Sequence, residues 1–152
     1  MNLTNLDFHL KIKPVMETKK IYDLENRLVK FACMCLDVCD RLPNTKAGQN
    51  LAQQLSRSGT APAVGYGEAQ AADSHADFFL KMRLVLKEIR ETNISLRIIN
   101  EKPSLANEES VIALKECKEL MAIFLKSVGT SKKNQVLKEK QTSNDSATLQ
   151  PG

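Results

Sequence analysis

The chain has 152 residues, of which 42% are hydrophobic and 26% charged, with a formal net charge of +4 at pH 7. This length suits one domain with a sizeable core. No apolar run approaches the roughly 18 residues of a membrane-spanning helix. Asp7, His9 and Lys11 interrupt any secretory signal at the start of the sequence. We therefore expect a cytoplasmic protein without membrane contact.

Apolar residues recur at steps of three and four along most of the chain, a spacing typical of helices. A first helix is expected from about Thr18 to Leu42, after a flexible N-terminal arm at residues 1–16. Its apolar seam comprises Ile21, Leu24, Leu28, Phe31, Cys35, Val38 and Leu42. The helix should end before Pro43, because a proline pushes the preceding residue out of the α region.

A second helix, expected over residues 45–72, has an unusual composition. Its central part carries a single charge, Arg57, so most of its circumference suits burial. Gly59, Pro62 and Gly65 are unfavourable inside a helix, where proline costs about 3 kcal/mol. The helix therefore needs close packing against its neighbours. A local break near Pro62 is the alternative.

A third helix, expected over residues 74–100, is the element around which the chain is organised. Ser74 followed by Asp77 resembles a capping box at its start. One wide face of this helix predicts the core stripe of a bundled helix. That face comprises Phe78, Met82, Val85, Leu86, Ile89 and Leu96.

A fourth helix should begin after Asn107 and stop at Gly129, a natural C-terminal cap. Its broad core face comprises Val111, Leu114, Cys117, Leu120, Met121, Phe124, Leu125 and Val128. The polar composition of residues 130–152 predicts a disordered tail. Residues 17–129 are thus expected to form an all-α, antiparallel, up-down-up-down four-helix bundle, because the helices are of similar length and the links are short.

A second apolar line lies on the third helix, away from the core stripe. It is interrupted by a Lys87–Glu91 pair at helical spacing. Left in water, such a line is a liability, and a closed oligomer is an economical way to bury it. The oligomer-interface candidates are Leu80, Leu84, Ile94 and Ile98.

A basic flank lies between the two apolar lines of the third helix. Its residues extend along about 21 Å of helix and are spaced to follow a phosphate backbone. The other interpretation is a solvated face, partly neutralised by Glu88 and Glu91. The candidate nucleic-acid-binding residues are Arg83, Lys87, Arg90 and Arg97.

Arg57 and Glu68 are candidates for a buried polar network. They lie 11 residues apart, or about three turns, so they cannot pair within one helix. A lone buried charge is costly, so each needs a partner on another helix. Candidate partners on the third helix are Lys81, Lys87 and Glu88, in a role that sets helix register.

The sequence predicts no catalytic site. His75 stands beside Ser74 at a helix start and suits a cap better than nucleophilic catalysis. Glu88 and Glu91 are surrounded by basic residues at helix-pair spacing. No glycine-rich loop follows a strand to hold a phosphate. We therefore expect neither an enzyme, nor a cofactor, nor a small-molecule substrate.

The four cysteines favour packing over metal binding. Cys35 and Cys39 have the spacing to ligate one ion together, but Cys33 lies nearly opposite on the helix and Cys117 is distant. No CxxC pair is present, and the two histidines are not at ligand spacing. We expect buried thiols that act as small hydrophobic groups, and no metal site.

A long run of the sequence resembles a known family. This run is LPNTKAGQNLAQQLSRSGTAPAVGYGEAQAADSHADFFLKMRLVLKEIRET. It resembles the four helix bundle protein family, small bacterial proteins found as reading frames inside intervening sequences of large-subunit ribosomal RNA genes. The resemblance extends over residues 22–128. Three positions depart from the family pattern, namely Gly65, Leu80 and Ser95, so no side-chain role transfers there.

The resemblance implies an antiparallel four-helix bundle that assembles as a homopentamer, with no established biochemical activity. A similar bundle is the accessory protein of diversity-generating retroelements, a basic pentamer that binds nucleic acid and a reverse transcriptase. With the basic flank, this favours a non-catalytic homo-oligomer that binds RNA, with RNA or a nucleic-acid enzyme as its partner. The alternative is an adaptor bundle that binds a protein partner without nucleic-acid contact.

Overall fold

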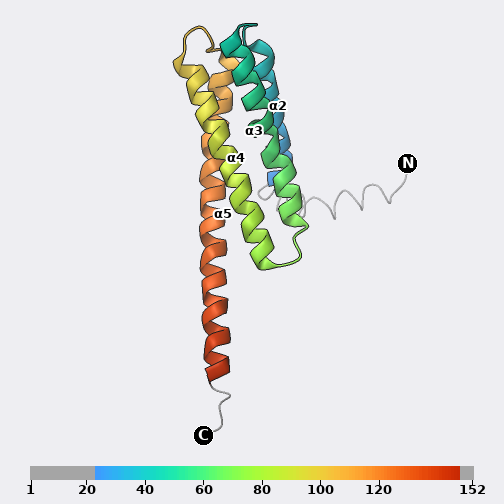
Figure 1. Cartoon of the computed structure of the whole chain (residues 1–152), viewed down its shortest axis with the longest axis vertical. Helices are drawn as coiled ribbons and strands as arrows, with labels where there is room; N and C mark the ends of the chain where they lie inside the picture. Colours follow the sequence, from blue (N-terminus) through green and yellow to red (C-terminus); the bar gives the residue numbers. More distant parts are fainter. Residues whose placement is uncertain (1–22, 148–152) are drawn as a thin grey trace, which may run out of the picture.

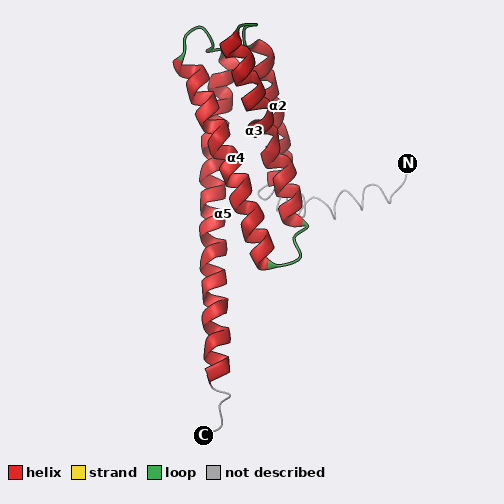
Figure 2. Cartoon of the chain, in the orientation of Figure 1, coloured by secondary structure: helices red, strands yellow, loops and turns green. Residues whose placement is uncertain are grey.

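The computed structural model describes residues 23–147. They form four helices and no strand (Figures 1 and 2), namely α2 (Leu24–Arg41), α3 (Lys46–Gln70), α4 (His75–Glu101) and α5 (Glu108–Ala147). The predicted arm at 1–16 and the first expected helical residues, 18–22, lie outside the described residues. Asp23 caps α2 by accepting from the backbone N–H of Asn26.

Contacts between the helices define a four-helix bundle with an antiparallel arrangement. Neighbours are α2 with α3, α3 with α4, α4 with α5, and α5 with α2, while α2 and α4 are diagonal. Arg27 pairs with Glu116, whereas Arg41, at the other end of α2, pairs with Glu109, earlier in α5. The two helices therefore run in opposite directions. The predicted fold class is confirmed.

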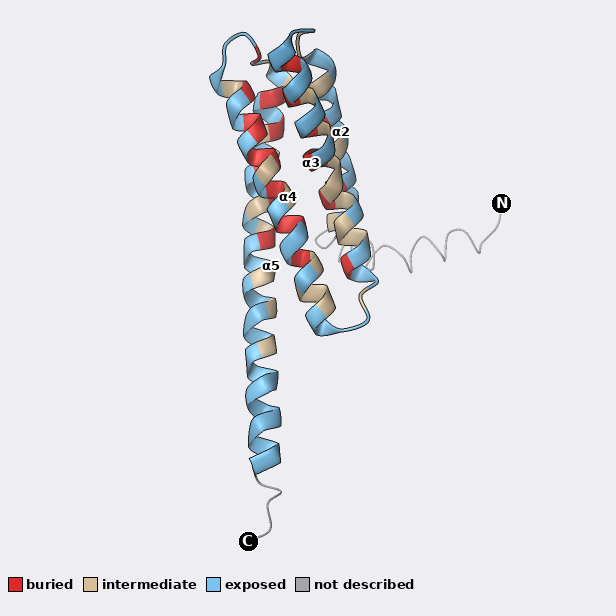
Figure 3. Ribbon diagram, viewed as in Figure 1, coloured by how far each residue is buried: buried red, intermediate tan, exposed pale blue. Residues whose placement is uncertain are grey.

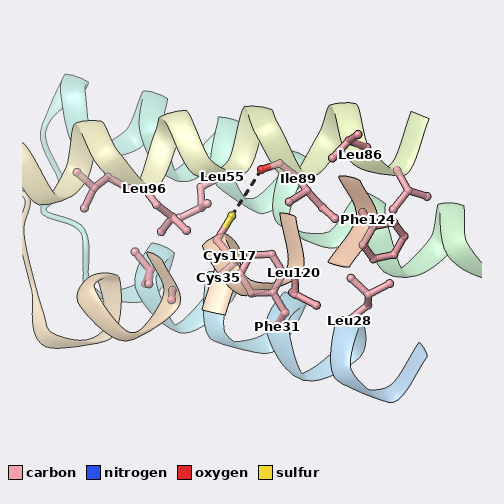
Figure 4. Packing of buried hydrophobic residues seen from close by; sticks show 14 of the residues in the cluster. Leu28, Phe31, Cys35, Leu55, Leu86, Ile89, Leu96, Cys117, Leu120 and Phe124 are labelled. Atoms are coloured by element: carbon pink, nitrogen blue, oxygen red, sulfur yellow. Dashed lines mark hydrogen bonds between the residues drawn. The ribbon is translucent and has the colours of Figure 1, made fainter. Parts of the chain in front are cut away.

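The core fills the space between the four helices (Figures 3 and 4). The side chains predicted on the inner face of α4 are at most 7% exposed, except for the half-buried Phe78. The Cys117 thiol donates to the carbonyl of Ile89 at 3.5 Å, deep in the same layer. Two residues predicted for the core face of α5, Val111 and Leu125, are instead 61% and 44% exposed. That predicted face was too wide.

Helix α3 is continuous through Pro62, which is buried, so the predicted helix is confirmed and a break there is not. Its small residues lie where neighbouring helices approach most closely. A Cβ atom at Gly59 would come within 2.7 Å of the Cys35 side chain on α2. A Cβ at Gly65 would lie 3.0 Å from Val85 on α4. This packing compensates for the poor helix propensity of the segment.

The C-terminal part of the chain differs from the sequence expectation. Helix α5 continues through Gly129 to Ala147, so the predicted stop and the disordered tail are wrong for residues 130–147. Gly129 does not adopt the positive φ of a helix-ending glycine. No proline follows before Pro151, and Lys, Glu, Gln and Leu favour helix. Residues 148–152 lie outside the described part.

Candidate interaction surface on helix α4

The N-terminal cap orients helix α4 as expected. The Ser74 hydroxyl accepts a hydrogen bond from the backbone N–H of Asp77 at 3.1 Å. From this start, the 27 residues of α4 present one side to the core and the opposite side to solvent. Because α4 contacts only α3 and α5, nothing in the described chain covers its outer side.

The outer apolar line of α4 is exposed over its whole length. Leu80, Leu84, Ile94 and Ile98 expose 53%, 52%, 55% and 46% of their area. The first and the last of them lie 18 residues apart, or about 27 Å along the helix. Lys87 and Glu91 lie on the same side, with charged atoms 4.0 Å apart. The line therefore consists of two apolar pairs with a charged pair between them.

Exposed aliphatic residues also occur on both neighbours of α4, which sequence patterns did not indicate as a surface. Val64 of α3 is 65% exposed, and Val111 and Ile112 of α5 are 61% and 54% exposed. Scattered surface aliphatics are ordinary in soluble proteins. The line on α4 differs because its four members share one side of one helix.

All four residues of the basic flank are exposed, as a nucleic-acid-binding role requires. The Arg83 guanidinium lies 5.8 Å from the centre of the Phe79 ring, which holds it along the helix. Arg97 pairs with Glu101 at 3.8 Å. Arg90 has no ion pair within 4.0 Å among the described residues. Three arginines thus recur every seven residues, about 10.5 Å apart.

Two acidic residues beside this flank form ion pairs with an arginine of α3. Arg57 donates to Glu91 at 2.7 Å and lies 3.4 Å from Glu88. The hydrogen bond from Arg57 is the main cause that lowers the pKa of the Glu91 carboxyl, and nearby Lys87 adds to it. Glu91 therefore pairs with two cations, Arg57 and Lys87, and it neutralises the charge of Lys87 only in part.

The predicted buried polar network is wrong in its burial and in its membership. The Arg57 side chain is 61% exposed, and Glu68 is also at the surface. Lys81 pairs with Asp77 of its own helix at 2.8 Å. That hydrogen bond is the main cause that raises the pKa of Lys81, with a smaller attraction from Glu68. Only the Arg57–Glu88 contact across two helices agrees with the prediction.

The cysteines divide into buried and accessible thiols. Cys35 and Cys117 are fully buried, and burial raises the pKa of the Cys117 thiol to about 12. Cys39 is half-buried with a pKa raised to about 11, mainly by burial, while Cys33 is exposed and departs from the expectation. Within residues 23–147, no cluster of three His, Cys, Asp or Glu residues has metal-binding geometry. No described helix is long and apolar enough to cross a membrane.

Comparison with known proteins gives a structural neighbour. No protein-family model matches the chain, and no curated protein does so. A crystal structure from Bacteroides thetaiotaomicron is similar in fold, with a TM-score of 0.62 and 24% sequence identity. The match covers 68% of this chain and 96% of that one. That protein is described as one of unknown function from the S23 ribosomal protein family. At this identity the likeness concerns the fold.

Proposed function

We propose that this protein is a non-catalytic, cytoplasmic homo-oligomer that binds RNA through the basic flank of α4. The observation that carries the proposal is the outer side of that helix. Four aliphatic residues there are about half exposed, and exposed arginines lie beside them. An uncovered apolar line indicates an interaction surface, and a line of exposed cations that are only partly compensated by acidic residues suits an anionic polymer.

The family resemblance supports the partner and the stoichiometry. The family consists of bundles encoded within ribosomal RNA genes, and resemblance to it implies a homopentamer. The neighbour from the S23 ribosomal protein family has a similar fold. A ring of five would repeat Arg83, Arg90 and Arg97 around one axis. Repeated weak phosphate contacts then act together and raise the apparent affinity without any new contact.

A substitution at the apolar line tests the assembly. We expect Leu84→Glu to produce monomers in light scattering, because a carboxylate would be buried at the interface. RNA binding should weaken with it, as the multivalent contact is lost. Leu137→Glu is the matched control, since Leu137 is 61% exposed on α5 and off the line. A Leu84→Glu protein with the wild-type mass would refute the interface.

A second substitution tests the basic flank without disturbing the apolar line. Arg90→Glu should keep the oligomer mass and weaken RNA binding, with a shallower dependence on salt. Lys30→Glu makes the same charge change on α2, diagonal to α4, and should leave binding close to wild type. If Arg90→Glu binds RNA as well as wild type, the flank is not the RNA site. An adaptor bundle with a protein partner would then be the better account.

A further inference from the structure

The acidic and basic side chains of α5 lie on different sides of the helix. Glu109 and Glu116 face α2, where they pair with Arg41 and Arg27. Lys118 follows Glu116 by two residues, or about 200° around the helix, so it lies on the side away from α2. Within the described chain, no lysine of α5 has an ion pair within 4.0 Å. The acidic side of α5 is therefore paired, and its basic side is not.

Helix α4 separates its charges in the same way. Glu88 lies 3.4 Å from Arg57 of α3. Arg97 follows Glu88 by nine residues, or about two and a half turns, so it lies on the opposite side, toward α5. Arg90 and Arg83 precede Arg97 by seven and fourteen residues, on nearly the same line. The basic sides of both helices therefore lie on the outer face that α4 and α5 form together.

The cations of the two helices follow one another along this face. Helices α4 and α5 are antiparallel, and the Cys117 thiol donates to the carbonyl of Ile89 at 3.5 Å. Lys126 is nine residues past Cys117, or about 13.5 Å along α5, and Arg83 is six residues before Ile89, or about 9 Å along α4. Both steps go in the same direction, so these two cations lie within one helical turn of each other in level. The arginines of α4 thus end where the lysines of the second half of α5 begin.

Past Lys126, helix α5 extends beyond the bundle and keeps a positive charge. Figure 1 shows it continuing past the α3–α4 turn, and Figure 3 shows its surface mostly exposed there. Residues 126–147 contain five lysines against two acidic residues, Glu139 and Asp145, for a net charge of +3. All five lysines are exposed. This half of α5 is therefore a cationic helix in solvent.

Three of these lysines continue the line of arginines. Lys126, Lys133 and Lys140 recur every seven residues, about 10.5 Å apart, and the three arginines of the basic flank have the same spacing. Gln135 and Lys138 line a groove against the α3–α4 turn. Lys133 lies two residues before Gln135, and Lys140 two after Lys138, so both point away from that groove. The two lines, each about 21 Å long, meet near Lys126 and form one cationic track.

We propose that this track is one binding site for double-helical RNA, in which the projecting half of α5 extends the contact that α4 begins. The inference rests on the proposed RNA binding by α4 and adds the form of the RNA and a second contact element. A straight line of evenly spaced cations follows the phosphates along a rigid duplex. A single strand needs aromatic side chains on which its bases stack, and every aromatic side chain within residues 23–147 is buried or partly buried.

A double substitution on the projecting half of α5 tests this site in the full-length protein. We expect Lys133→Gln, Lys140→Gln to bind a fluorescent RNA duplex of about 20 base pairs several-fold more weakly, with a salt dependence shallower by about two in the slope of log K against log salt. Lys30→Gln, Lys138→Gln is the matched control. It removes the same charge from α2 and from the groove side of α5, and should bind as wild type does.

The two double variants should keep the wild-type helix content and mass in circular dichroism and light scattering, because Lys and Gln have similar helix propensities. Equal weakening in both variants would overturn the contact with α5. Arg90→Glu separates this inference from the proposed function. If Arg90→Glu weakens binding and Lys133→Gln, Lys140→Gln does not, α4 binds RNA without α5, and the extended track is refuted. If neither weakens binding, the proposed RNA site on α4 fails as well.

The form of the RNA is tested with a duplex and an unstructured single strand that carry the same number of phosphates. Wild-type protein should bind the duplex several-fold more tightly, because the track follows a rigid backbone and offers no surface for base stacking. This preference should shrink in Lys133→Gln, Lys140→Gln, which shortens the track. Equal or tighter binding of the single strand by the wild-type protein would overturn the assignment to double-helical RNA.

Discussion

The two sides of α4 have nearly the same composition and opposite environments. On the inner side, Ile89 and Leu96 are fully buried and Met82 is 2% exposed. On the outer side, Leu84 and Ile94 are 52% and 55% exposed. Both sides are aliphatic lines at helical spacing. The difference lies in what covers them, since the inner line packs against the other helices and no other described helix covers the outer line.

This contrast shows what a hydrophobic pattern determines. The period of a helix separates one apolar line from another, but it does not say whether a line is covered by the same chain or by another molecule. In α4 the inner line explains the stability of the bundle. The outer line is about half exposed in the isolated fold, and the interface proposed above is the explanation that we give for it.

A pair of truncations on α4 should give the largest difference between the two sides. Ile89→Ala removes a fully buried side chain and should lower the free energy of unfolding by about 2–5 kcal/mol. Leu84→Ala should change the monomer's stability by less than about 0.5 kcal/mol. Urea unfolding at low protein concentration measures both. Equal losses at the two positions would mean that the outer line is covered within the chain.

Much of the fold could be predicted from the sequence, because local signals and burial agree there. The start of α4 is an example, since Ser74 and Asp77 form the expected cap. The end of α5 could not be predicted in the same way. Residues 130–147 have a polar composition typical of disorder, yet they contain no proline or glycine that would break a helix. The identity of the single residues does not decide between a disordered tail and a continued helix.

The candidate site shows the same division. The exposed line of Leu80 and its partners was predictable, because its spacing is a property of one helix. The polar network was not, because Arg57 has a long side chain that reaches Glu91 across the surface without being buried. Sequence also gave no signal for the groove of about 690 Å³ that the α3–α4 turn forms with Ser131, Gln135 and Lys138 of α5.

A smaller effect should follow from a single methyl group inside the bundle. A Cβ at Gly59 would lie 2.6 Å from the Cβ of Cys35, so Gly59→Ala should cost about 1–3 kcal/mol through overpacking. Gly67→Ala is the control on the same helix, because a Cβ there meets nothing within 4 Å. It should be neutral or gain up to about 1 kcal/mol from helix propensity. Denaturant midpoints that fall equally would refute the close contact of α3 with α2.

The smallest expected effect concerns the ion pair at the edge of the outer side of α4. The hydrogen bond from Arg57 lowers the pKa of Glu91 below its ordinary value of 4.5. Because the folded-state pKa is the lower one, the pair stabilises the protein above the unfolded pKa, and this contribution disappears as pH falls through the folded value. Both side chains are more than one third exposed, so solvent screens the pair and the gain in stability at neutral pH should be small.

Replacement of Arg57 separates this contribution from general acid denaturation. Arg57→Met should be slightly less stable than wild type at pH 7, and the difference should shrink toward zero as the pH falls below 4.5. Arg83→Met is the control, because Arg83 lies over the Phe79 ring instead of pairing with a carboxylate. Its difference from wild type should vary much less across that range. If the Arg57→Met difference is as large at pH 3 as at pH 7, charge pairing with Glu91 is not its cause. The contact of Arg57 with Glu91 would then make no pH-dependent contribution to the stability of the bundle.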